Sequence, residues 1–196
     1  IYECILDAGS IAASYQPGHS HADSFSFVLY HHYSPFIVDV GISTYEKGDI
    51  RNYERSTKAH NTVEIENENQ SEVWDGFRVG RRANVKIINE TDTSITASHD
   101  GYKNHFNVIH ERSFSFMAQS VAITDDIQNP KTVKAKAYLH FHPACKIEIK
   151  DGIIMVHNIA TISFTNADRI YLEFYKYALG YNLCQDAKVL VIEFHK

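Results

Sequence analysis

The sequence predicts an all-β protein, a large two-sheet antiparallel sandwich without long helices, and three observations support this. The 12 tyrosines and 11 phenylalanines are residues that favour strands. Strand-like runs recur about every 8–12 residues, separated by turn signals such as Asn129-Pro130 and Asp151-Gly152. No segment carries the apolar spacing of a helix longer than two turns. Because no linker rich in proline or glycine divides the chain, we expect one domain over residues 1–196.

The individual strands follow from short alternating runs. Residues 1–17 predict an edge strand and a loop, and residues 24–30 alternate apolar and polar side chains as a half-buried strand does. Residues 36–40 form the returning strand. The polar stretch 41–58 is expected to be a long surface loop, the kind that often carries function, and 59–63 begins the next strand. Further strands are expected at 83–88, 93–98, 106–116, 119–127, 133–142, 145–150, 153–157, 161–165, 170–178 and 187–195.

Charge and composition exclude several classes of function. The net charge of -5 provides no basic field for nucleic acid. No apolar run approaches the ~18 residues that span a bilayer, and no signal peptide is visible. The 3 cysteines show no CxxC spacing, so they predict neither a disulfide framework nor a thiolate zinc site. The chain begins with isoleucine, which is compatible with the later part of a longer protein.

Four polar residues stand out because they lie at or inside expected strands. His19 and His21 are two residues apart, so both would project to one face of an extended segment. Asp39 lies inside an apolar run, where a carboxylate is costly unless it is paired. His60 opens the strand at 59–63. Imidazole and carboxylate groups suit Zn²⁺, although histidines satisfied by hydrogen bonds in the core are the alternative.

Two motifs resemble those of a known family. Residues 18–27, GHSHADSFSF, are similar to the GHxHAD-x-x-SF motif of the heparinase II/III-like family, and 55–63, RSTKAHNTV, are similar to its RSTxAHNTV motif. Members are polysaccharide lyases that act on glycans containing uronic acid, including heparin, heparan sulfate and alginate. Weaker similarities occur at 38–41, 70–74, 77–83, 99–102, 110–112 and 140–143, so the resemblance covers nearly the whole chain.

The resemblance implies a fold, a metal and a reaction. In this family a helical toroid precedes a β-sandwich, and the chain resembles the sandwich only. One structural zinc per chain would be held by His21, Asp39 and His60, and His19 would reach the substrate cleft as a catalytic group. An open zinc position would by itself suggest hydrolysis by a metal-bound water. The resemblance implies β-elimination instead.

Other residues are weaker candidates for substrate binding. Arg55, Arg78 and Tyr53 could bind a carboxylate or sulfate, with structural ion pairs as the alternative. His99 and Tyr102 could line the cleft, with a structural role as the alternative. The expected partners are an acidic polysaccharide and an N-terminal toroid of the same protein, and an oligomer is possible. A periplasmic or secreted location is expected from the resemblance. The rival function is a metal-stabilised sandwich that binds glycan, or acts as a scaffold, without cleaving it.

Overall fold

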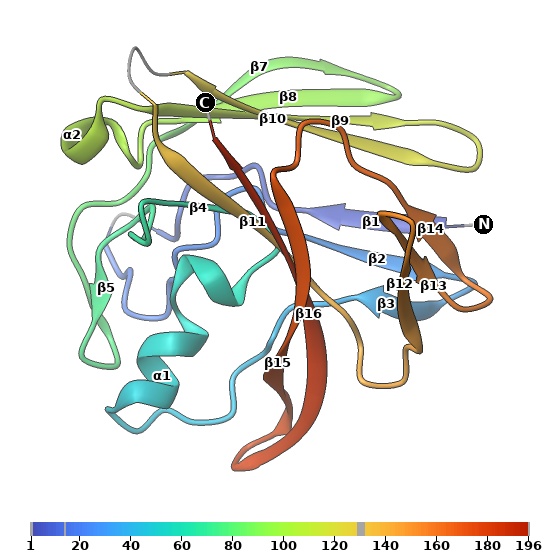
Figure 1. Cartoon of the computed structure of the whole chain (residues 1–196). Coiled ribbons are helices and arrows are strands. Elements are labelled where there is room, and N and C mark those ends of the chain that lie inside the picture. The colour runs from blue at the N-terminus through green and yellow to red at the C-terminus, as the bar shows by residue number, and fades with distance from the viewer. Residues whose placement is uncertain (1, 14, 129–131, 196) are drawn as a thin grey trace.

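The computed structural model describes residues 2–13, 15–128 and 132–195, and these form five small antiparallel sheets (Figure 1). The turn expected at Asn129-Pro130 lies outside the described residues. Two helices and one 3-10 turn interrupt the strands: α1 (Asp49–Glu54), α2 (Lys103–Phe106) and η1 (Thr57–Ala59). Within the described ranges, no helix is long and apolar enough to cross a membrane.

Two four-stranded sheets form the body of the molecule. The first has the order β10-β9-β8-β7 and lies at the top of Figure 1, and the second has the order β15-β16-β11-β4. Their strands are β7 (Val85–Thr91), β8 (Ser94–His99), β9 (Ile109–Phe116), β10 (Val121–Gln128), β4 (Val63–Ile65), β11 (Lys134–His140), β15 (Arg169–Gly180) and β16 (Leu183–His195).

Three smaller sheets complete the fold, in the orders β1-β2-β3, β12-β13-β14 and β5-β6. Their strands are β1 (Tyr2–Leu6), β2 (Phe27–His31), β3 (Ser34–Ile37), β12 (Ile147–Lys150), β13 (Ile153–Val156), β14 (Ala160–Ile162), β5 (Val73–Trp74) and β6 (Arg78–Val79). Asp151 and Gly152 join β12 to β13 with φ angles of 51° and 75°, as a two-residue hairpin turn requires. All the strand ranges expected after residue 83 overlap observed strands.

The core occupies both faces of the β15-β16-β11-β4 sheet. Leu190 points into a cluster with Phe27, Phe114 and Phe141. Its neighbours Val189 and Val191 point to the opposite face, because side chains alternate along a strand. That second face packs against Val40, Ala59 and Tyr53, which belong to the segment around α1 and η1. The sheet therefore supports the polar segment that carries the candidate site.

Four sequence expectations for the first half differ from the structure. The strand expected at 36–40 ends at Ile37, so Asp39 lies outside it, and the strand expected at 59–63 begins only at Val63, so His60 lies before it. The stretch 41–58 is not a surface loop, because it contains α1 and η1 and buries Arg51, Glu54 and Arg55. The strand expected at 24–30 begins only at Phe27. Phe25 precedes it in a turn with φ 67°, and the backbone N–H of Ser26 donates to the oxygen of Asp23 at 2.9 Å. A positive φ is unusual for a bulky residue and keeps this segment out of the sheet.

Candidate functional site

The two histidines of the GHSHAD motif lie in a loop, not on a strand. The N–H of Ser20 donates to the oxygen of Pro17 at 2.9 Å, and this turn separates the two side chains. His19 is exposed, whereas His21 is buried, with 8% of its surface accessible. The expectation that both rings share one face is therefore wrong. The turn sends one imidazole to the surface and the other inward.

Arg55 fixes this loop from inside the protein. Its Nε and Nη2 donate to the backbone oxygen of Ser20 at 3.0 and 2.9 Å. Nη1 donates to the oxygen of Trp74 at 3.2 Å, and Nη2 also donates to the oxygen of Arg78 at 3.3 Å. The N–H of Ala22 donates to the oxygen of Arg55 at 2.9 Å. Because the side chain is fully buried, Arg55 holds the loop rather than facing a ligand.

His21, Asp23 and His60 form the candidate metal centre. One ligand atom from each lies within 4.8 Å of the others, and the two imidazole centroids are 5.2 Å apart. Nη1 of Arg51 lies 3.3 Å from Nε2 of His21. Burial, with the positive charges of His60 and Arg51, lowers the pKa of His21 to about 3. The ring is therefore neutral, which is the form that binds a metal.

Asp39 forms a hydrogen bond with the ring of His60. Its Oδ2 lies 2.6 Å from Nδ1 of His60, and its Oδ1 accepts the N–H of Gly41 at 2.8 Å. Burial favours a higher pKa for Asp39, but the charge and hydrogen bond of His60 outweigh it and hold the pKa below its usual range. Burial favours a lower pKa for His60, but Asp39 raises it above the usual value. The carboxylate thus fixes the orientation of this ring.

The residues present fit a zinc ion. Nε2 of His60 is buried and has no hydrogen-bond partner, so it is available as a ligand while Nδ1 is held by Asp39. Two ligands of one tetrahedral zinc, each at about 2.0 Å, are about 3.3 Å apart. The 2.6 Å contact is too short for an ion shared by Asp39 Oδ2 and His60 Nδ1. Asp23 contributes the carboxylate of the group whose ligand atoms lie within 4.8 Å of one another, whereas Asp39 lies against Nδ1 of His60.

His19 packs edge-on against a pair of stacked aromatic rings, Tyr45 and Phe77, whose centroids are 6.0 Å apart. Its centroid is 5.5 Å from that of Phe77 and 6.0 Å from that of Tyr45, at interplanar angles of 75° and 81°. The Tyr45 and Phe77 rings are nearly parallel, at 10°. The guanidinium of Arg51 lies 5.3 Å from the Tyr45 centroid and 5.8 Å from the Phe77 centroid. The loop, the segment before α1 and the β5–β6 hairpin therefore meet around one imidazole.

The expected substrate-binding residues are dispersed. Tyr53 is half-buried in α1, where burial, followed by the charges of Glu173 and Asp39, raises its pKa to about 12. Arg78 is exposed and its Nε lies 3.4 Å from Asp75.

His99 and Tyr102 are buried in the interior. The hydroxyl of Tyr102 donates to the oxygen of Val63 at 2.8 Å, and Nδ1 of His99 accepts the N–H of Gly101 at 3.1 Å. Both have partners inside the protein and neither faces solvent.

A buried network behind Phe25 supports the site. Nε2 of His99 lies 3.0 Å from Nδ1 of His110, whose Nε2 lies 2.7 Å from Oδ1 of Asp125. Arg112 donates to both oxygens of Asp125 at 2.7 and 2.9 Å. Nη1 of Arg112 also donates to the oxygens of Phe25 at 3.0 Å and Asn61 at 2.7 Å. The network thus joins β9 and β10 to the residues beside Asp23 and His60.

Asn61 is a structural residue that sequence reasoning missed. Its Nδ2 donates to the oxygens of Phe27 at 2.7 Å and Val38 at 2.8 Å, and its Oδ1 accepts the N–H of His140 at 2.7 Å. It is fully buried and joins three strand regions next to His60. Its position in the RSTxAHNTV motif was the available signal. Asp23, Arg51, Tyr45 and Phe77 were also missed, although Asp23 lies in the GHxHAD motif and Phe77 in the weaker similarity at 77–83.

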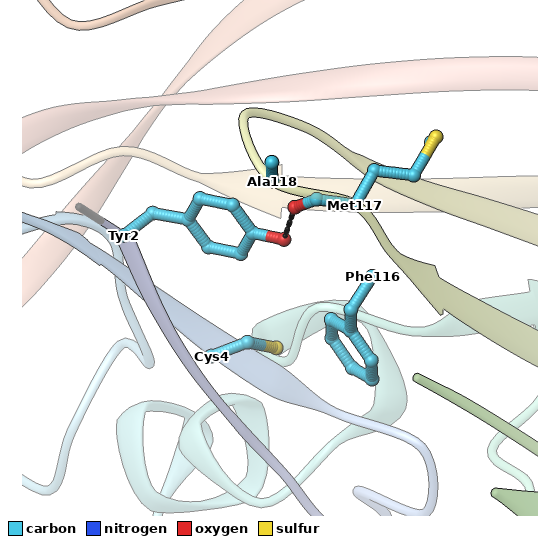
Figure 2. A pocket seen from close by; sticks show the side chains of 5 residues that line it. All are labelled: Tyr2, Cys4, Phe116, Met117 and Ala118. Carbon is cyan, nitrogen blue, oxygen red and sulfur yellow. Dashed lines mark hydrogen bonds between the residues drawn. The ribbon is translucent and has the colours of Figure 1, made fainter. Parts of the chain in front are cut away.

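A shallow hollow lies elsewhere on the surface (Figure 2) and is lined by Tyr2, Cys4, Phe116, Met117 and Ala118. The hydroxyl of Tyr2 donates to the oxygen of Met117 at 2.5 Å, across the gap between β1 and the turn after β9. Burial raises the pKa of Cys4 to about 11, so its thiol is neutral. None of the candidate site residues lines this hollow.

Comparison with known proteins gives a family and a fold. A family model described as Heparinase II/III-like, C-terminal, matches residues 2–196. The heparan sulfate lyase HepC from Pedobacter heparinus superposes with a TM-score of 0.75 at 21% identity, over 98% of this chain and 30% of that chain. A heparinase III with methylated lysines gives 0.78 at 16% identity, over 100% of this chain and 30% of that chain.

A further heparinase III structure gives a TM-score of 0.74 at 17% identity, over 100% of this chain and 31% of that chain. The chain therefore spans 30–31% of the length of these proteins. Curated protein sequences gave no match. The family resemblance and the sandwich fold expected from the sequence are confirmed.

Proposed function

Because the chain belongs to the heparinase II/III-like family, we propose that it is the sandwich part of a polysaccharide lyase. The substrate is an acidic glycan that contains uronic acid, of the heparan sulfate or alginate kind, and the reaction is a β-elimination. The observation that carries the proposal is the division of one short loop between exposed His19 and buried His21. The first can transfer a proton at the surface, while the second anchors the loop in the metal-binding cluster.

The elimination needs groups of the type that His19 provides. A base removes the C5 proton of the uronate, which is weakly acidic because it lies next to a carboxylate. The bond between C4 and the glycosidic oxygen breaks, a C4–C5 double bond forms, and an acid protonates the leaving oxygen. The charge that develops on the carboxylate must also be stabilised. We assign one proton transfer to His19 and place its partners in an N-terminal toroid of the same protein. The chain alone should therefore be a weak lyase.

We assign the cluster to one structural zinc ion, held by His21, Asp23 and His60. Bound there, zinc crosslinks the GHSHAD loop to the segment after η1. Its support for this loop fixes the direction of His19, two residues before a ligand. No step of the elimination passes through the ion. The resemblance implied Asp39 as the carboxylate ligand. We assign Asp23 instead, because Asp39 already contacts Nδ1 of His60.

The lyase proposal is tested in the full-length protein by ultraviolet absorbance of the unsaturated uronate, with heparan sulfate and alginate as substrates. His19→Ala should lower kcat by about 10²–10⁴-fold, the usual contribution of a general acid or base, and leave the melting temperature unchanged. His105→Ala, at an exposed histidine of α2, is the matched control and should retain activity. Wild-type turnover in His19→Ala would remove this residue from the mechanism. Glycan binding without new absorbance would identify a non-catalytic module, and new reducing ends without absorbance a hydrolase.

A further inference from the structure

The aromatic pair around His19 is a built feature of the surface. Lys47 and the hairpin residue Asp75 form an ion pair at 3.1 Å, which ties the segment of Tyr45 to the hairpin of Phe77. Nε of the buried Arg51 donates to the oxygen of Gly76 at 3.3 Å. Segments far apart in the sequence are therefore held together, and His19 packs against the ring that each one contributes.

The two rings are the contacts that orient His19. Among the described residues, no hydrogen bond to either of its ring nitrogens is found, and its side-chain contacts are the edge-on packing against Tyr45 and Phe77. A proton-transfer group with free ring nitrogens is available to a substrate. It nevertheless needs a fixed direction, because misplacement by about 1 Å can cost about 10²-fold in rate. Here direction comes from ring packing, and both nitrogens remain unbonded.

The same rings have surface left for a ligand. Tyr45 and Phe77 are 45% and 41% exposed, which is high for large aromatic side chains. The apolar C–H face of a pyranose can pack on such rings by dispersion and apolar burial. Arg51 lies beneath both rings, and its Nη2 has no hydrogen-bond partner. A buried cation under an aromatic surface favours an anionic sugar over a neutral one.

We propose that Tyr45 and Phe77 are positioning residues that hold the imidazole of His19 and form the wall of the adjoining uronate subsite. This inference rests on the proposed lyase function. According to this proposal, side chains of the sandwich both orient the imidazole of His19 and contact the sugar. Tyr45 lies outside the motifs that the sequence singled out, and Phe77 opens the weaker similarity at 77–83, where no role was assigned to it. The hairpin turn at Asp75 and Gly76 brings Phe77 to the site.

The first test measures the environment of His19 without using activity. Modification of His19 by diethyl pyrocarbonate is followed by mass spectrometry in the full-length protein, with and without a heparan sulfate tetrasaccharide. Phe77→Ala should increase the modification rate of His19 several-fold and reduce protection by the tetrasaccharide. Trp74→Ala is the matched control, because Trp74 lies on the same hairpin, is 44% exposed and makes no ring contact with His19. Equal rates in wild type and Phe77→Ala, with intact melting temperatures, would overturn the proposal.

The second test separates the ring from the hydroxyl of Tyr45. Tyr45→Phe should retain kcat, whereas Tyr45→Ala should lower it by about ten- to a hundredfold, with a rise in KM, because aim and wall are both lost. Loss of kcat in Tyr45→Phe equal to that in Tyr45→Ala would overturn a positioning role and assign the chemistry to the hydroxyl. If the wild-type protein shows no lyase activity, the proposed function fails. The modification and protection experiment then still decides whether the rings orient His19 and border a glycan site.

Discussion

Replacement of each of the two carboxylates near His60 should give opposite patterns of stability and metal affinity. Asp23 belongs to the group whose ligand atoms lie within 4.8 Å of one another, whereas Asp39 is bonded to Nδ1 of His60 at 2.6 Å. If Asp23 binds the zinc and Asp39 orients His60, then Asp23→Asn removes a ligand and Asp39→Asn removes its support. The two changes are matched, because each replaces one carboxylate oxygen by an amide nitrogen.

The magnitudes follow from these two roles. Loss of an outer partner typically lowers metal affinity about 10–100-fold, or about 1.4–2.7 kcal/mol, so Asp39→Asn should fall in this range. Asp23→Asn should lower zinc affinity by more than about 100-fold, because the ion loses a direct charged ligand. In the metal-free protein, the effects of the two variants on folding stability should have the opposite order. Burial raises the pKa of Asp23, so its charge is unfavourable there and the amide should be neutral or stabilising. Asp39→Asn removes a charge-assisted hydrogen bond and should cost about 1.5–3 kcal/mol.

Competition of the protein with a fluorescent chelator measures zinc affinity, and urea denaturation in excess chelator measures the stability of the metal-free protein. Wild-type protein purified without chelator should contain about one zinc per chain by metal analysis, as three protein ligands predict. A larger loss of affinity in Asp39→Asn than in Asp23→Asn would refute the reasoning and make Asp39 the direct ligand. Unaltered zinc affinity in both variants would remove the cluster as a metal site.

Two further predictions concern the buried network of β8, β9 and β10. Asp125→Asn should destabilise the protein by about 3–5 kcal/mol in urea denaturation, because it leaves buried Arg112 without its charged partner. The control is Asp186→Asn, which breaks an equally short but exposed ion pair with Lys176 at 2.7 Å and should leave stability unchanged. Equal losses of stability in the two variants would contradict the argument. Burial lowers the pKa of His99 and His110. At these two positions the unfolded state therefore binds protons more readily than the folded state. The urea midpoint of the metal-free protein should fall as the pH drops below about 6.5, so a flat profile from about pH 6.5 to about pH 5 would disprove this linkage.

The second half of the fold was predictable because its signals are local. Asp151-Gly152 requires a tight turn whatever lies around it, and the alternation in β11 and β16 fixes which side chains enter the core. The proximity of His21 and His60 was also expected, from their residue types and positions and more specifically from the family resemblance. Their motifs are short and specific, so the two imidazoles could be grouped without knowledge of the strand order.

The rest could not be predicted, because it depends on partners far away in the sequence. Arg55 falls in the stretch 41–58, whose polar composition predicts a surface loop. It is buried because the backbone oxygens of Ser20, Trp74 and Arg78 accept hydrogen bonds from its guanidinium. No local sequence pattern predicts this arrangement. The opposite directions of His19 and His21 likewise depend on one turn rather than on a strand period. Sequence analysis predicts that such polar side chains are exposed, because the backbone oxygens that bind them in the core cannot be identified from the sequence.

The burial of Arg55 explains how an irregular loop can hold an exposed imidazole, to which we assign a proton transfer. The loop from Gly18 to Ser26 contains no strand or helix, so its own backbone cannot give it rigidity. Rigidity comes from outside: Arg55 binds the oxygen of Ser20, Arg112 binds that of Phe25, and His21 packs on His60. Each contact lies within a few residues of His19, yet none touches its ring. Because the side chains that stiffen the loop are internal, both ring nitrogens of the exposed imidazole are left without a hydrogen bond within the described residues. In the proposed function, internal side chains hold the loop and the exposed imidazole transfers the proton, so a change at His19 itself should affect turnover without lowering stability.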